Sequence, residues 1–162
     1  MDQRYFSDRY TITEQILRSK KDMCDALNEI IVVVEEKVFP DFRMRLDELP
    51  TLDPVIYCFL TVGEWLNYEE WEGFEGALYF HPERVVDQIE KTLHLPEIAL
   101  ILKRAKQIHR EQFEQQQVKL TREGFVSPTP EFTAWYHLFE VNKPKVVEAL
   151  YSMVKMNVTK FP

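Results

Sequence analysis

The stretch DPVIYCFLTVGEWL, residues 53–66, decides the fold class. Asp53 is a residue type that caps helix N-termini, and Pro54 suits the first helical position, where its missing N–H leaves no bond unmade. The apolar residues that follow recur at three- and four-residue steps and cover a broad surface. This pattern predicts a helix at the centre of the molecule.

Helical spacing continues on the N-terminal side of this stretch. A long helix is predicted from Thr13 to Val38, with Thr11 or Thr13 as its N-cap and Pro40 at its end. Its buried stripe includes Met23 and Cys24.

On the C-terminal side, residues 69–80 are predicted to form a short or interrupted helix, because Gly73 and Gly76 lower helix propensity. His81-Pro82-Glu83 and Pro96 each open a further helix. The residues expected to face inward from the first of these are Val85, Val86, Ile89 and Leu93.

The end of the chain is predicted to contain two more helices after a loop. The helix from Pro96 is expected to fray at 115–117, and turn-forming residues indicate an ordered or flexible loop near 118–130. The first C-terminal helix contains Phe132, and Pro144 opens the second.

These elements predict an all-α fold, a single helical domain over residues 1–162 built as an irregular bundle of six or seven helices. The 162 residues are 45% apolar, enough for one continuous core. No apolar stretch reaches the roughly 20 residues of a membrane span, and Met1-Asp2-Gln3-Arg4 lacks a signal-type apolar region. We therefore expect a cytoplasmic protein without membrane contact.

Catalytic and metal-binding motifs find little support in the sequence. No serine has a glycine beside it, and neither GxxxxGK[ST] nor GxGxxG occurs. Cys24 and Cys58 lack CxxC spacing and are expected to be reduced thiols, although the sequence leaves a disulfide open. Glu90 and His94, at helical i, i+4 spacing, are expected to form a solvated or structural pair. No cofactor or metal is predicted, and a non-enzymatic role is favoured over catalysis.

Acidity is concentrated between Leu46 and Glu83, where nine Asp and Glu side chains occur without a single Lys or Arg. Charges within a Debye length, about 8 Å at physiological salt, reinforce each other's potential and steer basic partners. Alternatively, these carboxylates form an ordinary solvated face, and cationic side chains from distant helices fold back against them.

Large aromatics alternate with the acids between Glu64 and Phe80, and exposed aromatics would be suitable anchors for a partner. This is the predicted partner-binding region. Its candidate residues are Glu64, Glu69, Glu70, Trp71, Glu72, Phe74 and Glu75.

Glu64-Trp65-Leu66-Asn67, Trp71-Glu72-Gly73-Phe74 and Leu78-Tyr79-Phe80 together resemble the acidic, Gly-Phe-containing signature of a bacterial DNA-mimic protein family. The resemblance covers residues 55–110, including two amphipathic helices after the motif. It implies a small helical protein, acting as a dimer, that presents carboxylates like DNA phosphates to a DNA-binding regulator. The Asn-Gly-Gly-Phe run of the family is absent here.

The leading hypothesis is a non-enzymatic interaction protein that binds a basic protein surface, with DNA mimicry as its sharper form. An immunity protein that neutralises a cationic toxin is the first alternative. A small carboxylate- or metal-dependent hydrolase, using Glu64, Glu69 or Glu70 with His81 or His137, is the second. Direct nucleic-acid binding is not expected at a net charge of −7, and a homodimer is compatible with the pattern.

Overall fold

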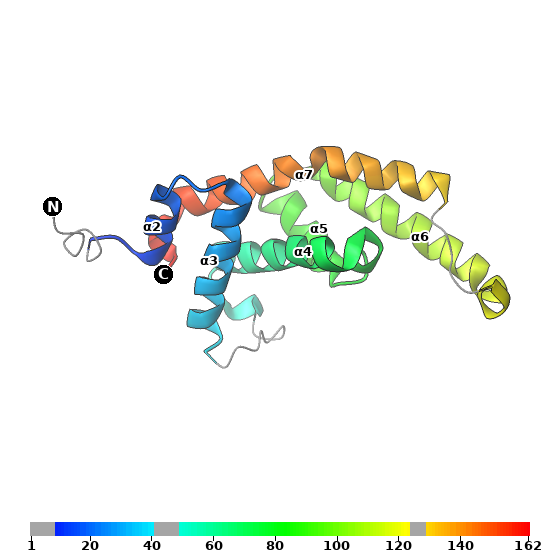
Figure 1. Cartoon of the computed structure of the whole chain (residues 1–162), viewed down its shortest axis with the longest axis horizontal. Helices are drawn as coiled ribbons and strands as arrows, with labels where there is room; N and C mark the ends of the chain where they lie inside the picture. Colours follow the sequence, from blue (N-terminus) through cyan, green and yellow to red (C-terminus); the bar gives the residue numbers. More distant parts are fainter. Residues whose placement is uncertain (1–8, 41–48, 124–128) are drawn as a thin grey trace. The chain divides into compact units, whose positions relative to one another are not determined.

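The computed structural model describes residues 9–40, 49–123 and 129–162, with side chains of the second range as far as Gln112. Helices make up this part of the chain, and no strand occurs within it, so the all-α prediction is confirmed. The elements, shown in Figure 1, are α2 (Ile12–Arg18), α3 (Met23–Val38), η1 (Leu49–Thr51), α4 (Pro54–Ala77), α5 (Pro82–Lys91), α6 (Pro96–Glu123), α7 (Pro130–Met156) and η2 (Val158–Lys160).

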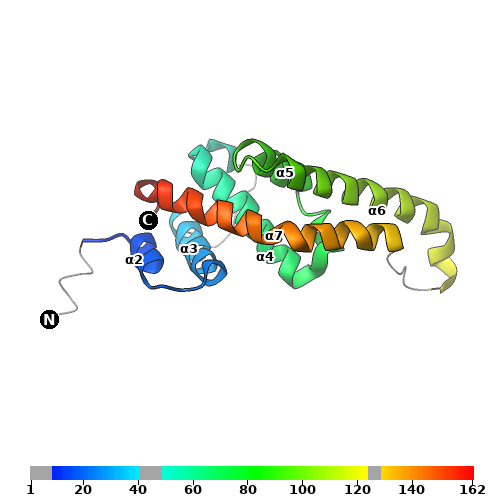
Figure 2. The same ribbon diagram turned by 90° about the horizontal axis from the view of Figure 1, so that it is seen from above.

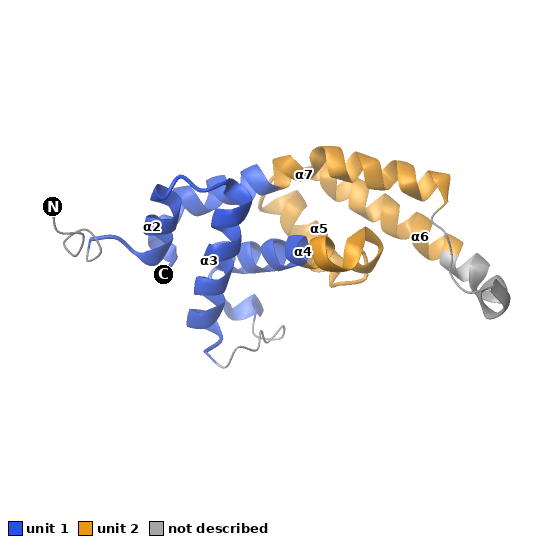
Figure 3. Cartoon of the chain, viewed as in Figure 1, with its two compact units in different colours: residues 1–67, 147–162 blue, residues 68–146 orange. Residues whose placement is uncertain are grey.

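Two compact units make up this all-α domain (Figure 3). Residues 1–67 and 147–162 belong to the first unit, and residues 68–146 belong to the second. Helices α4 and α7 contribute residues to both units.

The predicted helix from Thr13 to Val38 is wrong as a single element. The chain forms α2 and α3 instead, with Lys20 between them in the left-handed region at φ 56°. Asp22 starts the second helix, because its side chain accepts a hydrogen bond from the Cys24 N–H at 2.9 Å. Met23 and Cys24, predicted to be buried, therefore occupy an exposed first turn.

Thr11 is the N-cap of α2, one of the two caps that the sequence predicted. The Glu14 N–H donates to Thr11 Oγ1 at 3.2 Å, and the Thr11 N–H donates to Glu14 Oε2 at 2.7 Å. This reciprocal capping box satisfies two N–H groups that a helix start otherwise leaves without acceptors.

The C-terminal prediction of two helices is also wrong, because Pro144 lies inside the continuous helix α7. A proline removes the hydrogen bond to the carbonyl four residues earlier, but buried side chains on both sides, Phe139 and Val146, hold the helix in place. The preceding loop is shorter than predicted, since α6 continues through 115–117 to Glu123. Residues 124–128 lie outside the described part.

Helix α4 begins after Asp53, as predicted, with the Val55 N–H donating to Asp53 Oδ1 at 2.9 Å. The predicted interruption is confirmed at Gly73, where the backbone adopts φ 82° and ψ 166°. Residues other than glycine almost never occupy this region. Helix α4 therefore consists of two helical segments that meet at a kink at Gly73.

The core of the first unit forms where α3 and α4 approach closely. A Cβ atom at Gly63 would lie 2.8 Å from Ile31 Cδ1, so a larger residue at this position would force the Ile31 side chain to shift. Phe59 packs edge-on against Phe161, with ring centroids 5.2 Å apart. The Thr13 N–H donates to the Pro162 carbonyl at 2.9 Å, which places α2 beside the end of the chain (Figure 1).

The second unit is built around the C-terminal turn of α4. Phe74 packs against Phe132, Tyr136 and Phe139 of α7, with ring centroids 5.0 to 5.8 Å apart. Helices α5 and α6 pack against each other as a pair (Figure 2). The residues predicted to face inward from α5, namely Val85, Val86, Ile89 and Leu93, are all buried.

Replacing Gly73 with alanine is expected to destabilise the fold by about 1–3 kcal/mol, because the alanine Cβ strains a backbone at φ 82°. Gly76→Ala is the matched control, since Gly76 lies in a helical turn of the same segment, where an alanine Cβ meets Glu72 Cβ at 3.3 Å but does not strain the backbone. Urea unfolding of both variants measures the difference. Equal stabilities would contradict the strained conformation.

Candidate functional site

Basic side chains from elsewhere in the chain pair with most acids of the segment Leu46–Glu83 that the structure describes. Their pairs are Asp53 with Lys160 at 3.3 Å, Glu69 with Lys143 at 2.5 Å, Glu70 with Lys143 at 3.7 Å, Glu75 with His109 at 3.5 Å and Glu83 with Lys106 at 2.6 Å. Asp47 and Glu48 lie outside the described residues. Three lysines therefore offset part of the negative charge of the segment, with Lys143 shared between Glu69 and Glu70.

Glu69 is the buried member of this set, 7% exposed. Its carboxylate accepts a hydrogen bond from Lys143 Nζ, which joins α4 to α7 within the second unit. Removing one partner of such a buried pair leaves an uncompensated charge in a poorly solvated place. Glu69 thus stabilises the packing of α4 against α7 and is not accessible to a partner.

Phe74 is likewise a core residue, 5% exposed within the aromatic cluster on α7. Next to it lies a cavity of about 320 Å³. The cavity lining consists of Glu72, Gly73, Phe74, Glu75, Phe132, Thr133 and Tyr136. The cavity therefore combines aromatic faces with two carboxylates.

Trp71 has the opposite orientation, with 87% of its surface exposed. Its neighbours Glu70 and Glu72 are exposed too. Among the described residues, no hydrogen bond or ion pair involves Glu72, whereas Glu70 lies near Lys143. The predicted region thus presents one large indole between two carboxylates at its surface.

Sequence comparisons place the chain in a family. Residues 11–159 match the family model described as the YfbN C-terminal domain. The chain belongs to this family. The match extends through both compact units.

One relative is a protein of Escherichia coli (strain K12) described as "Uncharacterized protein YfbN". It is 37% identical over 98 residues, which cover 59% of the chain and 41% of the relative. The chain therefore spans less than half of that relative's length. No solved structure matches the chain. The family match does not test the resemblance to DNA-mimic proteins, which stays a prediction.

Six of the seven predicted partner-binding residues lie together in the second unit, whereas Glu64 lies in the first. Glu64 is partly buried and hydrogen-bonds to Glu35 of α3. Burial is the largest cause that raises the pKa of Glu64, and with the hydrogen bond and the charge of Glu35 it brings this pKa to about 8. At neutral pH this carboxyl is largely protonated, so it contributes little to the acidic surface of this family member.

The expected histidine partners of a hydrolase are elsewhere in the described structure. His137 Nδ1 lies 3.5 Å from Glu140, and His81 occupies the N-cap position of α5 with a left-handed backbone. The histidine that does meet an acid of the segment is His109, whose Nδ1 also lies 2.8 Å from Tyr79 Oη. No sequence spacing indicates this contact, because His109 comes from a different helix.

The structure also shows where the candidate metal ligands and the two cysteines lie. Glu90 pairs with Lys103 at 3.1 Å, and the predicted pair with His94 fails because α5 ends at Lys91 and His94 is not helical. Cys24 is exposed and Cys58 is buried, both as thiols. Within the described residues, no three His, Cys, Asp or Glu side chains gather as metal ligands, and no helix is suited to cross a membrane.

Glu64→Gln is expected to remove a pH dependence of stability. Because the pKa of Glu64 rises from 4.5 to about 8 on folding, the folded state keeps a proton that the unfolded state releases. The stability of the unmodified chain should therefore fall as pH rises from 4.5 to 8. Glutamine mimics the protonated carboxyl, so the variant's stability advantage should grow across this window.

Thermal unfolding followed by circular dichroism across the same pH range measures this advantage. Glu36→Gln is the control, because Glu36 is an exposed neighbour on α3. A constant difference in stability between Glu64→Gln and the unmodified chain at all pH values would contradict the raised pKa of Glu64.

Proposed function

We propose that the chain is a non-enzymatic interaction domain that binds a cationic protein surface through Trp71 and the carboxylates of Glu70 and Glu72. The observation that carries the proposal is the exposed Trp71 indole, 87% accessible between two acidic neighbours. An indole attracts a Lys or Arg cation through its ring face, and large aromatics are frequent anchors of interfaces. Flanking carboxylates add charge attraction to the same cation.

Lack of internal packing at Trp71 supports the proposal. Burying an indole stabilises a fold strongly, as for Trp65, which is fully buried in the first unit. The adjacent cavity offers further carboxylate and aromatic contacts through Glu72 and Tyr136. A partner's cationic side chain can therefore contact Trp71 while a neighbouring group enters the cavity.

DNA mimicry is the sharper form of this proposal and requires carboxylates spaced along the surface like phosphates. Glu70 and Glu72 would belong to such a row. The pairing of Glu69, Glu75 and Glu83 with basic side chains supports a compact acidic patch more than a long row. A DNA-binding regulator and a cationic toxin are both partners with the required chemistry.

The test compares variants in binding to proteins captured from a bacterial lysate at low salt and then purified. Trp71→Ala is expected to weaken binding about tenfold or more, as at an interface anchor. Val141→Ala, at a side chain 76% exposed in the same unit, should leave binding unchanged. Bound proteins should be basic and should dissociate as salt rises.

Charge is tested separately with Glu70→Gln/Glu72→Gln against the charge-matched variant Glu36→Gln/Glu148→Gln, which removes two exposed acids elsewhere. Weakened binding in the first variant alone supports a local site. Equal weakening in both would indicate only general attraction, and it would overturn the proposal, as would a partner that ignores Trp71→Ala.

A further inference from the structure

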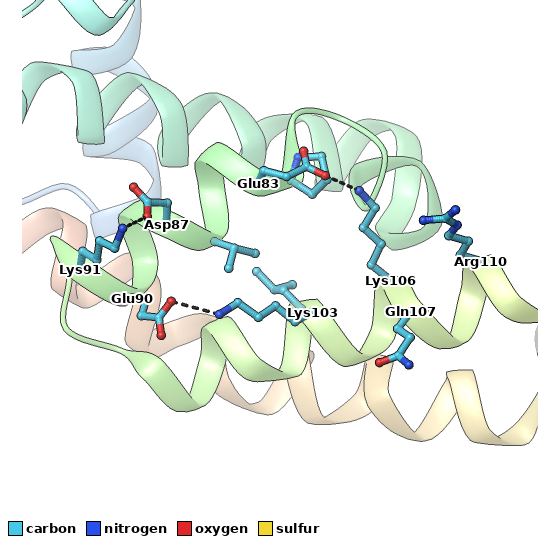
Figure 4. A pocket seen from close by; sticks show the side chains of 11 residues that line it. Glu83, Asp87, Glu90, Lys91, Lys103, Lys106, Gln107 and Arg110 are labelled. Carbon is cyan, nitrogen blue, oxygen red and sulfur yellow. Dashed lines mark hydrogen bonds and ion pairs between the residues drawn. The ribbon is translucent and has the colours of Figure 1, made fainter.

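A second surface lies between α5 and α6, outside the Trp71 region. The two helices enclose a groove of about 450 Å³ (Figure 4). Its floor contains the apolar side chains of Val86 and Leu102, both buried. Its two walls carry charged side chains, and the charge of one wall is mainly opposite in sign to that of the other.

One wall is a mainly acidic row on α5, in which Lys91 also lies and pairs with Asp87 at 2.5 Å, and the other is a basic row on α6. Glu83, Asp87 and Glu90 are spaced four and three residues apart, so they share one helix face. Lys103, Lys106 and Arg110 are spaced three and four residues apart and share the facing side of α6. The groove thus has parallel rows of opposite charge.

Ion pairs within the chain cross the groove at two places. Lys106 lies 2.6 Å from Glu83, and Lys103 lies 3.1 Å from Glu90. Most of these side chains remain accessible, with Glu83 78% and Lys103 51% exposed. Because a carboxylate accepts several hydrogen bonds and an ammonium donates three, both rows can bind further charges.

Parallel rows of opposite sign make the surface complementary to a second copy of itself. A two-fold axis parallel to the helices places the acidic row of one copy opposite the basic row of the other. A two-fold axis across the rows places like charges together and is disfavoured. Charge complementarity therefore favours a second copy of the chain as the partner and a two-fold axis parallel to the helices.

We propose that the α5–α6 groove is a homodimer interface in which two copies pair their acidic and basic rows around an axis parallel to these helices. Ten helical residues of α5 span about 15 Å, so the contact is small. Small interfaces with charged rims are weak and sensitive to salt. The dimer should therefore form at high protein concentration and dissociate as salt rises.

Sedimentation equilibrium of the unmodified chain and two charge-reversed variants tests the proposal. Glu83→Lys/Glu90→Lys gives two basic rows, and Lys103→Glu/Lys106→Glu gives two acidic rows. Each variant alone should be monomeric through repulsion. Mixed together, they should form a heterodimer, because each basic row then faces an acidic row.

Mixing also separates the interface from folding, since each variant loses the same two internal ion pairs, and mixing does not restore them. The substituted residues are on the surface, and a circular dichroism spectrum checks that each variant is helical. The proposal is overturned if the unmodified chain stays monomeric at its highest soluble concentration, or if the mixed variants remain monomers. Trp71, Glu70 and Glu72 are unchanged in both variants, so this outcome is independent of the partner-binding test.

Discussion

The buried ion pair between Glu69 and Lys143 is the interaction on which the candidate site depends. The Glu69 carboxylate is only 7% exposed, and Lys143 Nζ lies 2.5 Å from it as a close partner of opposite charge. The pair fixes α4 against α7 within the second unit. Phe74 reinforces this contact from the other side of Gly73 by packing against Phe139. With Glu69 and Phe74 both held inward, Trp71 between them is directed to the solvent.

Folding brings basic side chains next to the acidic segment Leu46–Glu83. Nine acidic residues without a basic one suggest a long negative surface. In the structure, however, lysines and a histidine from α6, α7 and η2 pair with most of the described acidic residues of this segment. Charge pairs at the surface contribute little to stability, but each paired lysine offsets part of the local negative field. Among the described acids of the segment, pairing with basic side chains is weak at Glu70 and absent at Glu72, and the proposed binding site uses these two carboxylates.

The sequence predicts local features well and long-range ones poorly. Thr11, Asp53 and Gly73 were placed correctly because caps and glycine conformations depend on neighbouring residues. The continuous helix through Pro144 was missed, since packing outweighs one lost hydrogen bond there. Which of the candidate residues are exposed depends on partners such as Lys143, 74 residues from Glu69, and no local spacing reveals such a partner.

Fluorescence of Trp71 tests most directly whether the segment turns Glu69 and Phe74 inward and Trp71 outward. The Trp71→Phe variant is compared with the unmodified chain during quenching by acrylamide, a neutral quencher that the nearby carboxylates do not repel. The substitution should remove a red-shifted, readily quenched component, whereas the buried Trp65 and the partly buried Trp135 should remain as better protected ones. Loss of a blue-shifted, protected component would show that Trp71 is buried and would contradict the account.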